Sequence, residues 1–510
     1  MPDAGAHRPN PSSDIIHDVI VIGGGINGCG IAMDAAGRGL RVLLCEQDDL
    51  ASATSSRSSK LIHGGLRYLE FFEFGLVGKA LAERETLLRN APHIIRPMRF
   101  RLPHQPHLRP AWMIRLGLFL YDHLARRETL PGSHGVKLQA DSPLRPEITR
   151  GFEYSDAWVD DARLVVLVAR AAAERGAVIL PRTACVKAER QGDLWRVTLE
   201  DRRTGQRQQH RSRALVNAAG PWVSNLLGQV IESASRRPLR LVKGSHIVVP
   251  RMYSAEHAYI LQNVDNRIVF VIPFEEDFSL IGTTDVDYQG DPAAAAISDE
   301  ETRYLLRLVN SHFQRQLTAS DVLWSFAGVR ALADEAGGKA QAASRDYMLD
   351  IESAPGQAPL LSVLGGKITT YRRLAEQAAD ELCELLQRPS RAWTSAAALP
   401  GGDFPDHGTL LADLQKLYPW LPETIARRFA RSYGTLTHEL LGDCSSLNGM
   451  GRDFGAGLHA LEVRYLIQHE WAATADDVLW RRSKLGLRLR PGQVAALQDY
   501  IELRSQWHRP

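Results

Sequence analysis

HDVIVIGGGINGCGIAMDAAGRGLRVLLCE (residues 17–46) joins a β-branched apolar run, a group of glycines and a second apolar run. The run at 17–22 is typical of a buried parallel strand. Gly23, Gly25 and Gly28 follow it with G-x-G-x-x-G spacing, where a helix over residues 27–38 is expected to begin. Such glycines allow a tight turn and let the backbone approach a pyrophosphate, which then faces the helix N-terminus. The stretch therefore predicts a dinucleotide-binding unit.

Glu46 supports this interpretation, because it ends the second apolar run 18 positions after Gly28. A carboxylate at this distance can accept a hydrogen bond from a ribose hydroxyl of the dinucleotide. Ala32 and Gly39 are small enough for the helix to pack closely on its strands. Their spacing resembles the extended fingerprint of FAD proteins more than that of NAD proteins.

Composition limits what else the chain can be. With 510 residues, 44% of them apolar and 24% charged, the chain has the size of about three soluble domains. A net charge of +2 gives no general attraction to nucleic acid, so we expect no nucleic-acid partner.

Metal sites and membrane-spanning helices are not expected. The five cysteines form no C-x-x-C pair, and the H-E-x-x-H pattern begun by His469 lacks its second histidine, since position 473 is Ala. Residues 1–13 are polar and contain no apolar signal segment, which predicts a disordered tail. The chain has no apolar run of about 18 residues that would span a bilayer, although binding at a membrane surface stays open.

Longer motifs follow the first unit. They are SSKLIHGGLRYLE (58–70), GFEYSDAWVDDARL (151–164), LVNAAGPWV (215–223), KGSHIVVP (243–250), IGTTDVDYQGDP (281–292), FAGVRAL (326–332), SRDY (344–347) and LGGKITTYR (364–372). With these motifs the chain resembles the FAD-dependent, quinone-reducing glycerol-3-phosphate dehydrogenases, in particular the bacterial aerobic form. The resemblance covers nearly the whole chain.

The resemblance implies an α/β fold: a Rossmann-like FAD-binding domain with an inserted antiparallel-sheet substrate domain and a helical C-terminal domain. The FAD-binding domain is expected at 14–80, 150–235 and 325–388. The substrate and membrane-facing domain is expected at 81–149 and 236–324, and the helical domain at 389–510. Without the family, residues 161–175 predict a helix capped by Asp160, and 268–274 with 278–285 predict a hairpin.

The cofactor is expected to lie against the fingerprint and several later segments. Ala218, Ala219 and Gly220 suit either close approach to a flat ligand or a plain tight turn. Residues 55–59 read SSRSS and are called the serine run. Arg57 departs from the family's pattern, because it adds a cation to this run. The resemblance implies FAD contacts from Gly23, Gly25, Ile26, Asn27, Gly28, Glu46, Thr54, Ser55, Ser56, Ser58, Ser59, Lys60, His63, Gly64, Gly65, Val186, Ala219, Gly220, Gly366, Lys367, Ile368 and Thr369.

Oxidation of a secondary alcohol requires a base for the hydroxyl proton and, for a phosphorylated substrate, fixed cations. The resemblance implies that substrate is bound by Arg67, Tyr68, Arg330, Arg345 and Lys367. Arg330 and Lys367 are also expected to be catalytic, and His246 is the candidate general base, since imidazole titrates near neutral pH. Two roles stay open for Lys367: it can hold the phosphate or stabilise negative charge on the reduced flavin.

Residues 96–127 carry seven arginines and one acid, interleaved with Trp112, Met113, Phe119 and Tyr121. This composition suits a helix lying on anionic lipid, and it also suits an amphipathic core helix with a solvated basic face. A second basic run, WRRSKLGLRLR, spans 480–490. The family resemblance favours the membrane interpretation for both runs. It implies a peripheral, monotopic enzyme on the cytoplasmic face of the bacterial inner membrane.

The resulting hypothesis is oxidation of sn-glycerol 3-phosphate to dihydroxyacetone phosphate by hydride transfer to FAD. The electrons would pass to ubiquinone or another membrane quinone, and a homodimer is compatible with the sequence. Two alternatives stay open: an oxygen-using FAD oxidase of glycerol phosphate or an amino acid, and a non-catalytic flavoprotein.

Overall fold

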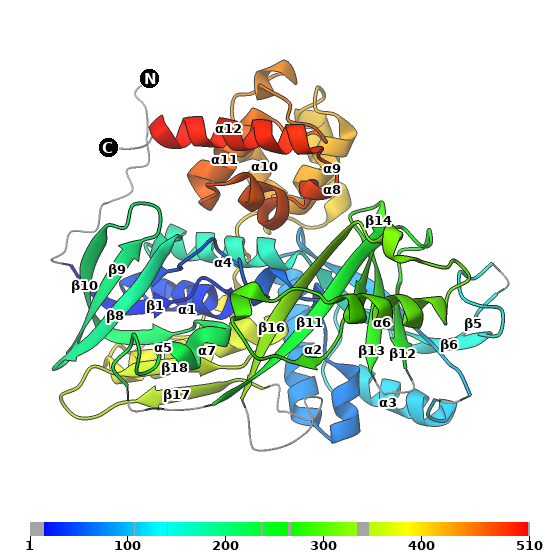
Figure 1. Ribbon diagram of the computed structural model, residues 1–510, viewed down its shortest axis with the longest axis horizontal. Coiled ribbons are helices and arrows are strands. Elements are labelled where there is room, and N and C mark those ends of the chain that lie inside the picture. The colour runs from blue at the N-terminus through cyan, green and yellow to red at the C-terminus, as the bar shows by residue number, and fades with distance from the viewer. Residues whose placement is uncertain are drawn as a thin grey trace.

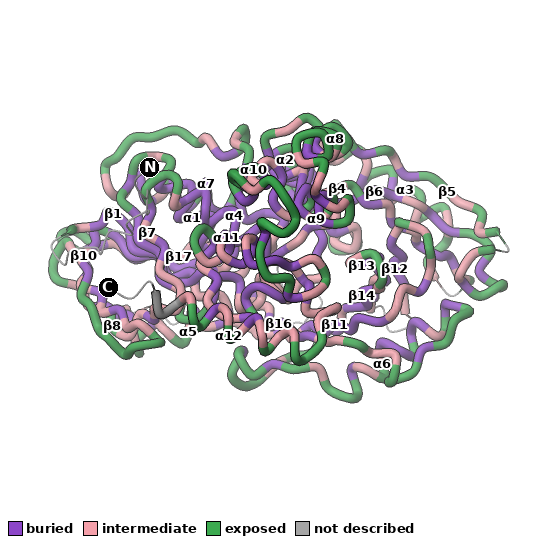
Figure 2. The backbone as a smooth tube through the Cα atoms, turned by 90° about the horizontal axis from the view of Figure 1, so that it is seen from above, coloured by how far each residue is buried: buried purple, intermediate pink, exposed green. Residues whose placement is uncertain are grey.

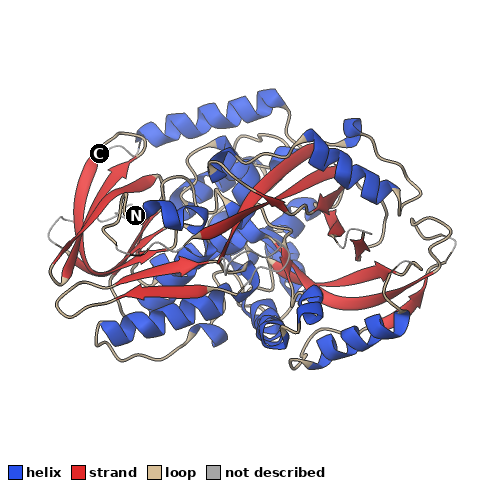
Figure 3. Cartoon of the chain, turned by 60° about the horizontal axis from the view of Figure 1, so that its bottom comes forward, coloured by secondary structure: helices blue, strands red, loops and turns tan. Residues whose placement is uncertain are grey.

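The structure is a computed structural model that describes residues 15–106, 108–139, 141–233, 235, 238–263, 267–333 and 346–507. The predicted tail at 1–13 and the candidate substrate residue Arg345 lie outside the described residues. Within those ranges the strands fall into two groups, with helices packed between and around them (Figure 3).

The first group of strands builds the sheet that the fingerprint predicts. In chain order the strands are β1 (Ile16–Ile22), β2 (Val42–Cys45), β7 (Val178–Leu180), β8 (Thr183–Gln191), β9 (Leu194–Asp201), β10 (Arg207–Asn217), β17 (Met348–Glu352) and β18 (Leu360–Leu364). Their order is β17-β18-β10-β1-β2-β7, with β9 on β10 and β8 on β9. β1 runs parallel to β2 and β10, and Val19, Ile20 and Val21 are fully buried. The predicted buried parallel strand is therefore confirmed.

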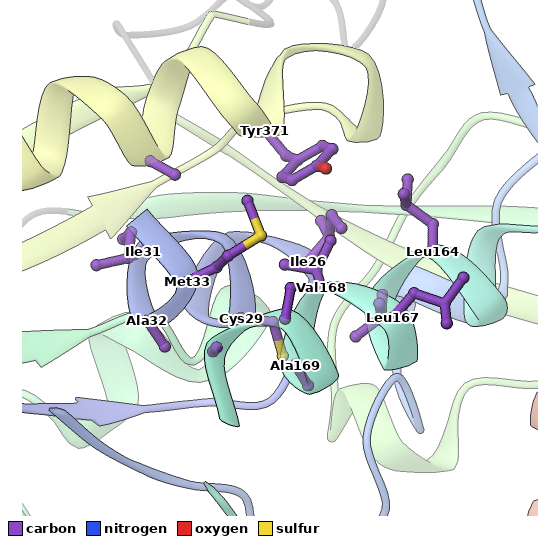
Figure 4. Packing of buried hydrophobic residues seen from close by; sticks show 14 of the residues in the cluster. Ile26, Cys29, Ile31, Ala32, Met33, Leu164, Leu167, Val168, Ala169 and Tyr371 are labelled. Carbon is purple, nitrogen blue, oxygen red and sulfur yellow. The ribbon is translucent and has the colours of Figure 1, made fainter. Parts of the chain in front are cut away.

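Helices α1 (Ile26–Gly37), α4 (Asp161–Glu174) and α7 (Tyr371–Leu385) pack beside this sheet. Figure 4 shows α1 between Leu164 and Leu167 of α4 on one side and Tyr371 of α7 on the other. Gly30 allows the second contact, since a Cβ there would lie 3.0 Å from Cδ2 of Tyr371. α4 begins where the sequence predicts, with Asp160 as its hydrogen-bonded N-cap.

The second group of strands forms a larger, mainly antiparallel sheet. In chain order the strands are β3 (Leu61–Ile62), β4 (Ile95–Pro103), β5 (His134–Lys137), β6 (Arg150–Val159), β11 (Leu239–Pro250), β12 (Ala258–Gln262), β13 (Ile268–Phe274), β14 (Phe278–Gly282), β15 (Val286–Asp287) and β16 (Trp324–Ala333). Their order is β15-β11-β14-β13-β12-β4-β6-β3, with β16 on β11 and β5 on β6. β13 and β14 form the predicted hairpin.

The strand pairing differs from the expected domain boundaries. β6 and all but the first residue of β16 lie in the segments 150–235 and 325–388, which the resemblance assigns to the FAD-binding domain. Both strands hydrogen-bond within the second sheet instead, β6 to β4 and β16 to β11. A strand's residues indicate which face is buried but not which strand it pairs with, so the sequence pattern does not contain this boundary.

The remaining helices lie either beside the two sheets or in the C-terminal domain. Beside the sheets lie α2 (Phe74–Asn90), α3 (Ala111–His123), α5 (Val223–Leu226) and α6 (Asp299–Asn310). The C-terminal domain contains α8 (His407–Leu417), α9 (Glu423–Ser432), α10 (Thr437–Leu441), α11 (Ala460–Glu470), the π-helical segment η10 (Asp477–Arg482) and α12 (Pro491–Trp507). This domain has its own core around Phe429, Tyr433 and Val463, as the helical pattern predicts.

The C-terminal domain and α3 lie on opposite sides of the molecule. In Figure 1 the C-terminal helices are at the top, above α4, whereas α2 and α3 are at the bottom. Seen from above, the buried residues concentrate around β1, α1 and α4 (Figure 2). Among the described residues, no helix combines the length and apolarity needed to cross a bilayer.

Candidate active site

A cavity of about 850 Å³ is lined by residues of both sheets. Its walls come from the β1–α1 turn, the loop after β2, the end of β10, and strands β11 and β16. The predicted site residues that line it are Gly23, Gly25, Ile26, Asn27, Glu46, Thr54, Ser55, Ser58, Ser59, His63, Gly65, Arg67, Tyr68, Ala219, Gly220, Arg330, Gly366, Lys367, Ile368 and Thr369. The predicted residues that do not line it are Gly28, Ser56, Lys60, Gly64, Val186 and His246.

The fingerprint glycines are required by close backbone packing. Gly23 has a φ of +115°, and a Cβ there would lie 2.5 Å from the carbonyl oxygen of Ala218 at the end of β10. A Cβ on Gly28 would lie 2.0 Å from the carbonyl oxygen of Gly23. Gly28 therefore holds α1 against the turn, while Gly25 and Ile26 present the N-terminus of α1 to the cavity.

Glu46 closes the other side of the turn. Its Oε2 accepts a hydrogen bond from the backbone N of Gly24 at 2.6 Å, and its Oε1 accepts one from Asp48 N at 2.9 Å. Burial raises the pKa of Glu46 to about 7. Hydrogen bonds from ribose hydroxyls would favour the ionised carboxylate, so the residue is suited to a dinucleotide.

Ser55 of the serine run and the preceding Thr54 fix the run between α1 and β16. Ser55 Oγ accepts a hydrogen bond from Ile26 N at 3.0 Å, which satisfies a free donor at the start of α1. Thr54 Oγ1 donates to the carbonyl oxygen of Val329 at 2.6 Å. The run therefore lies where its hydroxyls and backbone face the cavity.

Arg57 lines the cavity and is held by β16. Its Nη1 donates to the carbonyl oxygen of Ala327 at 3.1 Å, and burial lowers the pKa of its guanidinium. Gly328 makes room for this arrangement, since a Cβ there would lie 2.9 Å from the Cβ of Arg57. The extra cation is thus anchored to the second sheet.

Two residues expected to contact the cofactor, Lys60 and Gly64, do not line the cavity and pack within the protein. Lys60 is fully buried, and its Nζ donates to Asp161 at 2.7 Å, so the side chain cannot reach the cavity. Gly64 packs against α2 and α3, since a Cβ there would lie 2.6 Å from Leu81 and 2.8 Å from Tyr121. Neither role follows from the local motif, because both partners are distant in sequence.

Two arginines and a lysine also line the cavity. Arg330 is half-buried, forms an ion pair with Asp285 and donates from Nη2 to Thr283 Oγ1 at 3.3 Å. Lys367 Nζ lies 4.7 Å from the centre of the Tyr68 ring. Arg67 is half-buried and, within the described ranges, makes no ion pair or hydrogen bond. These side chains could bind an anionic substrate.

Glycines bring the lysine to this point. Gly365 and Gly366 have φ values of +76° and +100°, a left-handed backbone that other residues rarely adopt. Asn27 Nδ2 donates to the carbonyl oxygen of Gly365 at 3.3 Å, which ties this turn to the start of α1. Lys367 is therefore placed beside the cofactor fingerprint although 340 positions separate it from Asn27.

His246 lies directly behind the cavity wall. It is 2% exposed, stacks on Phe326 with centroids 4.8 Å apart, and its Nε2 lies 2.9 Å from Oγ of Ser59. Burial, reinforced by Arg330 and Lys60, lowers its pKa well below the usual value. His246 is therefore neutral near pH 7 and meets the cavity through Ser59, which lines it.

An apolar surface continues the cavity to the outside. We call it the η2–α3 surface: Phe71, Phe72, Phe74, Trp112, Met113, Leu116, Phe119 and Leu120, from the 3₁₀ helix η2 (Leu66–Phe71), the start of α2 and α3. Phe72 is 79% exposed and Trp112 66%. Phe72, Phe74, Met113 and Leu116 also line the cavity. Such a patch marks a membrane or protein contact.

The first basic run contains only one helix. Residues 95–103 form β4, where Arg99 and Arg101 both pair with Glu153 of β6. Only Ala111–His123 is helical, and its exposed side chains are mainly apolar, with Arg115 among them. The interfacial character therefore belongs to α3 and η2 and not to the whole stretch.

The second basic run is an interface within the chain. Arg482 is fully buried and pairs with Asp49, Lys484 pairs with Asp160 at 2.9 Å, and Arg488 pairs with Asp277 at 2.7 Å. It also lies in the C-terminal domain, opposite α3 (Figure 1). This contradicts the expectation that residues 480–490 face the membrane, because four of the five cations, Arg481, Arg482, Lys484 and Arg488, pair with acids distant in sequence.

Comparison with known proteins identifies the family. Residues 18–372 match the family described as FAD dependent oxidoreductase. The chain belongs to this family. Residues 392–507 match a second family, described as the C-terminal domain of alpha-glycerophosphate oxidase.

Several relatives of this FAD-dependent oxidoreductase are similar over nearly their whole length. A glycerol-3-phosphate dehydrogenase of Pseudomonas aeruginosa is 56% identical, over 99% of this chain and 98% of the relative. The aerobic glycerol-3-phosphate dehydrogenase of Escherichia coli is 54% identical, over 95% and 97%. A D-erythritol 1-phosphate dehydrogenase of Brucella abortus is 50% identical, over 95% and 97%.

A solved structure agrees with the fold. The glycerol-3-phosphate dehydrogenase of Bacillus halodurans, crystallised with FAD, superposes with a TM-score of 0.75 at 28% identity, covering 97% of this chain and 90% of that chain. An FAD-binding domain joined to a second sheet and a helical C-terminal domain is thus the architecture of this FAD-dependent oxidoreductase.

The residues present fit FAD. The N-terminus of α1 faces the cavity and suits a pyrophosphate, and Glu46 offers a carboxylate acceptor beside it. The small residues at 218–220 and 365–366 let the backbone lie close to a flat ligand. Oδ1 of Asn27 is buried without a hydrogen-bond partner among the described residues, as expected for a group that binds the cofactor.

Sequence reasoning missed several cavity residues. The structure adds Gln47, Asp48, Thr183, Ala184, Cys185, Trp222, Thr283 and Asp285. Trp222 and Asp285 lie inside the motifs LVNAAGPWV and IGTTDVDYQGDP, so the motifs carried a signal for them. The lining residues of β8 are 183–185 and do not include the expected Val186, which lies at a register shift of β8 between Cys185 and Lys187.

Proposed function

We propose that this FAD-dependent oxidoreductase oxidises sn-glycerol 3-phosphate to dihydroxyacetone phosphate and passes the electrons to a membrane quinone. The observation that carries the proposal is that Arg67, Arg330 and Lys367 line the same cavity as the FAD fingerprint. Relatives at 54–56% identity bear the name glycerol-3-phosphate dehydrogenase, which supports this substrate.

The cationic side chains orient the substrate. Arg67 and Arg330 each offer a planar fork of donors that suits a phosphate dianion, and Asp285 holds Arg330 in place. Binding the phosphate fixes the position of C2, which reduces the entropy that the reaction must lose. Bound FAD supplies the acceptor for the hydride that leaves C2.

Ser59 and His246 can take up the hydroxyl proton. Ser59 Oγ accepts the proton of the substrate hydroxyl as it donates its own to Nε2 of His246, and the two groups are already 2.9 Å apart. The lowered pKa of His246 keeps its imidazole neutral and able to accept that proton. Lys367 lines the cavity beside Tyr68, where it can either hold the phosphate or stabilise negative charge on the reduced flavin.

Anaerobic reduction of the purified yellow protein tests the proposal. Glycerol 3-phosphate is expected to bleach the visible flavin absorbance, and a soluble ubiquinone analogue is expected to restore it. FAD that stays oxidised with glycerol 3-phosphate would indicate a non-catalytic flavoprotein or another substrate. Rapid oxygen uptake without quinone would indicate an oxidase.

D-Erythritol 1-phosphate is a second candidate substrate, because a relative at 50% identity carries that name. Both substrates present a phosphate monoester and a secondary alcohol to the same cations. Comparison of kcat/KM for the two decides between them, and we expect the smaller glycerol phosphate to have the higher value.

We also propose that the protein docks on the cytoplasmic face of a bacterial inner membrane through the η2–α3 surface. Contiguous exposed aromatic and aliphatic side chains support this, as does their continuity with the cavity. A quinone in the bilayer would then reach the cavity without crossing water. Arg115, exposed on α3, suits anionic lipid.

A further inference from the structure

The loop at 47–60, here called the cofactor loop, is held from outside the cavity. Gln47, Asp48 and Ser52 of this loop line the cavity, but Asp49 does not and is 4% exposed. The Asp49 carboxylate accepts hydrogen bonds from Nη2 of Arg482 at 2.8 Å and from Nε of Arg481 at 2.5 Å. Both arginines belong to η10 of the C-terminal domain.

The arginine contact is part of a buried charge cluster. Arg481 Nη2 also donates to Asp477 at 2.5 Å, and Arg182 forms an ion pair with the same carboxylate. The backbone N of Arg182 donates to the carbonyl oxygen of Asp48 at 2.7 Å. The cluster therefore links η10, the start of β8 and the first residues of the cofactor loop.

The C-terminal domain also holds the other end of the loop. Lys484, 1% exposed, donates from Nζ to Asp160 at 2.9 Å. The neighbouring Asp161 accepts hydrogen bonds from Nζ of Lys60 at 2.7 Å and from Oγ of Ser58 at 2.8 Å. The N-terminus of α4 thus transmits the contact with Lys484 to residues 58–60.

We propose that Arg481, Arg482 and Lys484 are positioning residues for FAD, which clamp both ends of the cofactor loop from the side opposite the cavity. Docking of the C-terminal domain and binding of FAD then reinforce each other. The inference rests on the binding of FAD and not on the identity of the substrate.

The physical reason is preorganisation. The cofactor loop carries backbone and hydroxyl groups that face the cavity, and a loop that is ordered before binding loses less entropy when the cofactor arrives. The charges that order it are buried, so removal of one partner leaves an uncompensated charge. Because coupling between two binding events is reciprocal, FAD must in turn stabilise the docked C-terminal domain.

The test measures FAD affinity of the full-length protein. Apoprotein, prepared by removing FAD, is titrated with FAD for the wild type, Arg481→Gln, Asp49→Asn and the double variant. Arg481 is chosen because its side chain is 16% exposed, so the variant should fold. Arg481→Gln is expected to raise the Kd for FAD about tenfold, and Asp49→Asn by at least as much, because it also releases Arg482. The double variant should lose less affinity than the product of the two single effects, because both changes remove the Arg481–Asp49 contact.

Three further measurements separate positioning from general stability. Excess FAD is expected to restore the kcat of Arg481→Gln, and Arg481→Lys to recover part of the affinity. FAD is expected to raise the melting temperature of the wild type more than that of Arg481→Gln.

Arg170→Gln is the matched control, because Arg170 of α4 pairs with Glu439 of the C-terminal domain and has no contact with the cofactor loop in the described structure. It should lower the melting temperature, and because the domain stays docked in the folded protein it should change the Kd for FAD far less than Arg481→Gln does. The proposal is overturned if Arg481→Gln and Asp49→Asn bind FAD like the wild type, or if Arg170→Gln loses as much affinity as they do. Should Arg481→Gln not fold, the Kd values of Asp49→Asn and Arg170→Gln decide in the same way.

Discussion

At the scale of single residues, the cavity combines groups that no local pattern places together. Arg67 follows the Gly64-Gly65 pair, Arg330 lies on β16, and Lys367 follows a second glycine pair. Each of these residues alone has an ordinary structural explanation. Because all three line one cavity, they support the binding of a phosphorylated substrate there.

Arg330→Ala should raise KM for glycerol 3-phosphate and lower kcat/KM by about 2–4 kcal/mol of transition-state binding, because a fixed phosphate ligand is lost. Steady-state kinetics on the FAD-saturated enzyme measure this effect. Arg330→Lys keeps the charge but loses the planar fork, so its kcat/KM should lie between those of the wild type and Arg330→Ala. Near-normal kinetics in Arg330→Ala would remove Arg330 from the substrate site.

Ser59→Ala and His246→Gln should both slow flavin reduction by about 10²-fold or more, because the hydroxyl proton loses its acceptor. Stopped-flow absorbance under anaerobic conditions measures this step. If His246 acts through Ser59, the double variant should be no slower than the slower single variant. Normal flavin reduction in Ser59→Ala together with a slow His246→Gln would show that His246 acts by another route.

At the scale of elements, α3 and η2 have an unusual distribution of side chains. Only Leu118 and Tyr121 of α3 are buried, whereas Trp112, Leu116 and Phe119 are at least half exposed. A helix whose outer face is in contact with water would carry polar residues at those positions. This distribution is what the proposed docking of α3 on a membrane requires.

Leu116→Glu should weaken membrane binding without loss of folding, because it places a charge in the apolar surface. Flotation with vesicles that contain anionic lipid measures the bound fraction. Leu417→Glu is the matched control, since Leu417 is 60% exposed at the end of α8, in the C-terminal domain. Equal binding of the Leu116 and Leu417 variants would exclude the η2–α3 surface as the docking site.

The elements themselves were largely predictable. The first strand, α1, the capped α4 and the β13–β14 hairpin follow from hydrophobic pattern and turn chemistry. The pairing of β6 and β16 with the second sheet did not follow, because hydrogen bonds between strands distant in sequence are selected by the packing of the whole sheet.

At the scale of the whole molecule, several buried or half-buried histidines link stability to pH. Burial lowers the pKa of His17 to about 4, of His93 to about 3 and of His257 to about 4. An unfolded histidine has a pKa of about 6.5, so between these values the unfolded chain binds more protons than the folded protein. The free energy of unfolding should therefore fall as pH falls below about 6.5.

His93→Gln should reduce this loss of stability between pH 6.5 and 5, by at most about 1.4 kcal/mol per pH unit for one histidine. Denaturant unfolding at several pH values measures it. His123→Gln serves as the control, because His123 is exposed on α3. A pH dependence in His93→Gln identical to that of the control would contradict the assignment.

The sequence by itself determined the dinucleotide-binding unit, and the family resemblance of its longer motifs added FAD as the cofactor. Gly23, Gly25, Gly28 and Glu46 act within one βαβ unit, where the chain's own continuity sets every distance, so spacing along the sequence is enough to predict the site.

Only the tertiary structure decided what each cation does. Lys60 and Arg482 are buried in ion pairs, whereas Arg330 and Lys367 line the cavity, and no composition rule separates these two groups. The physical reason is that the role of a charged side chain depends on its burial and on partners from distant segments. Those partners become neighbours only when both sheets and the C-terminal domain are packed together.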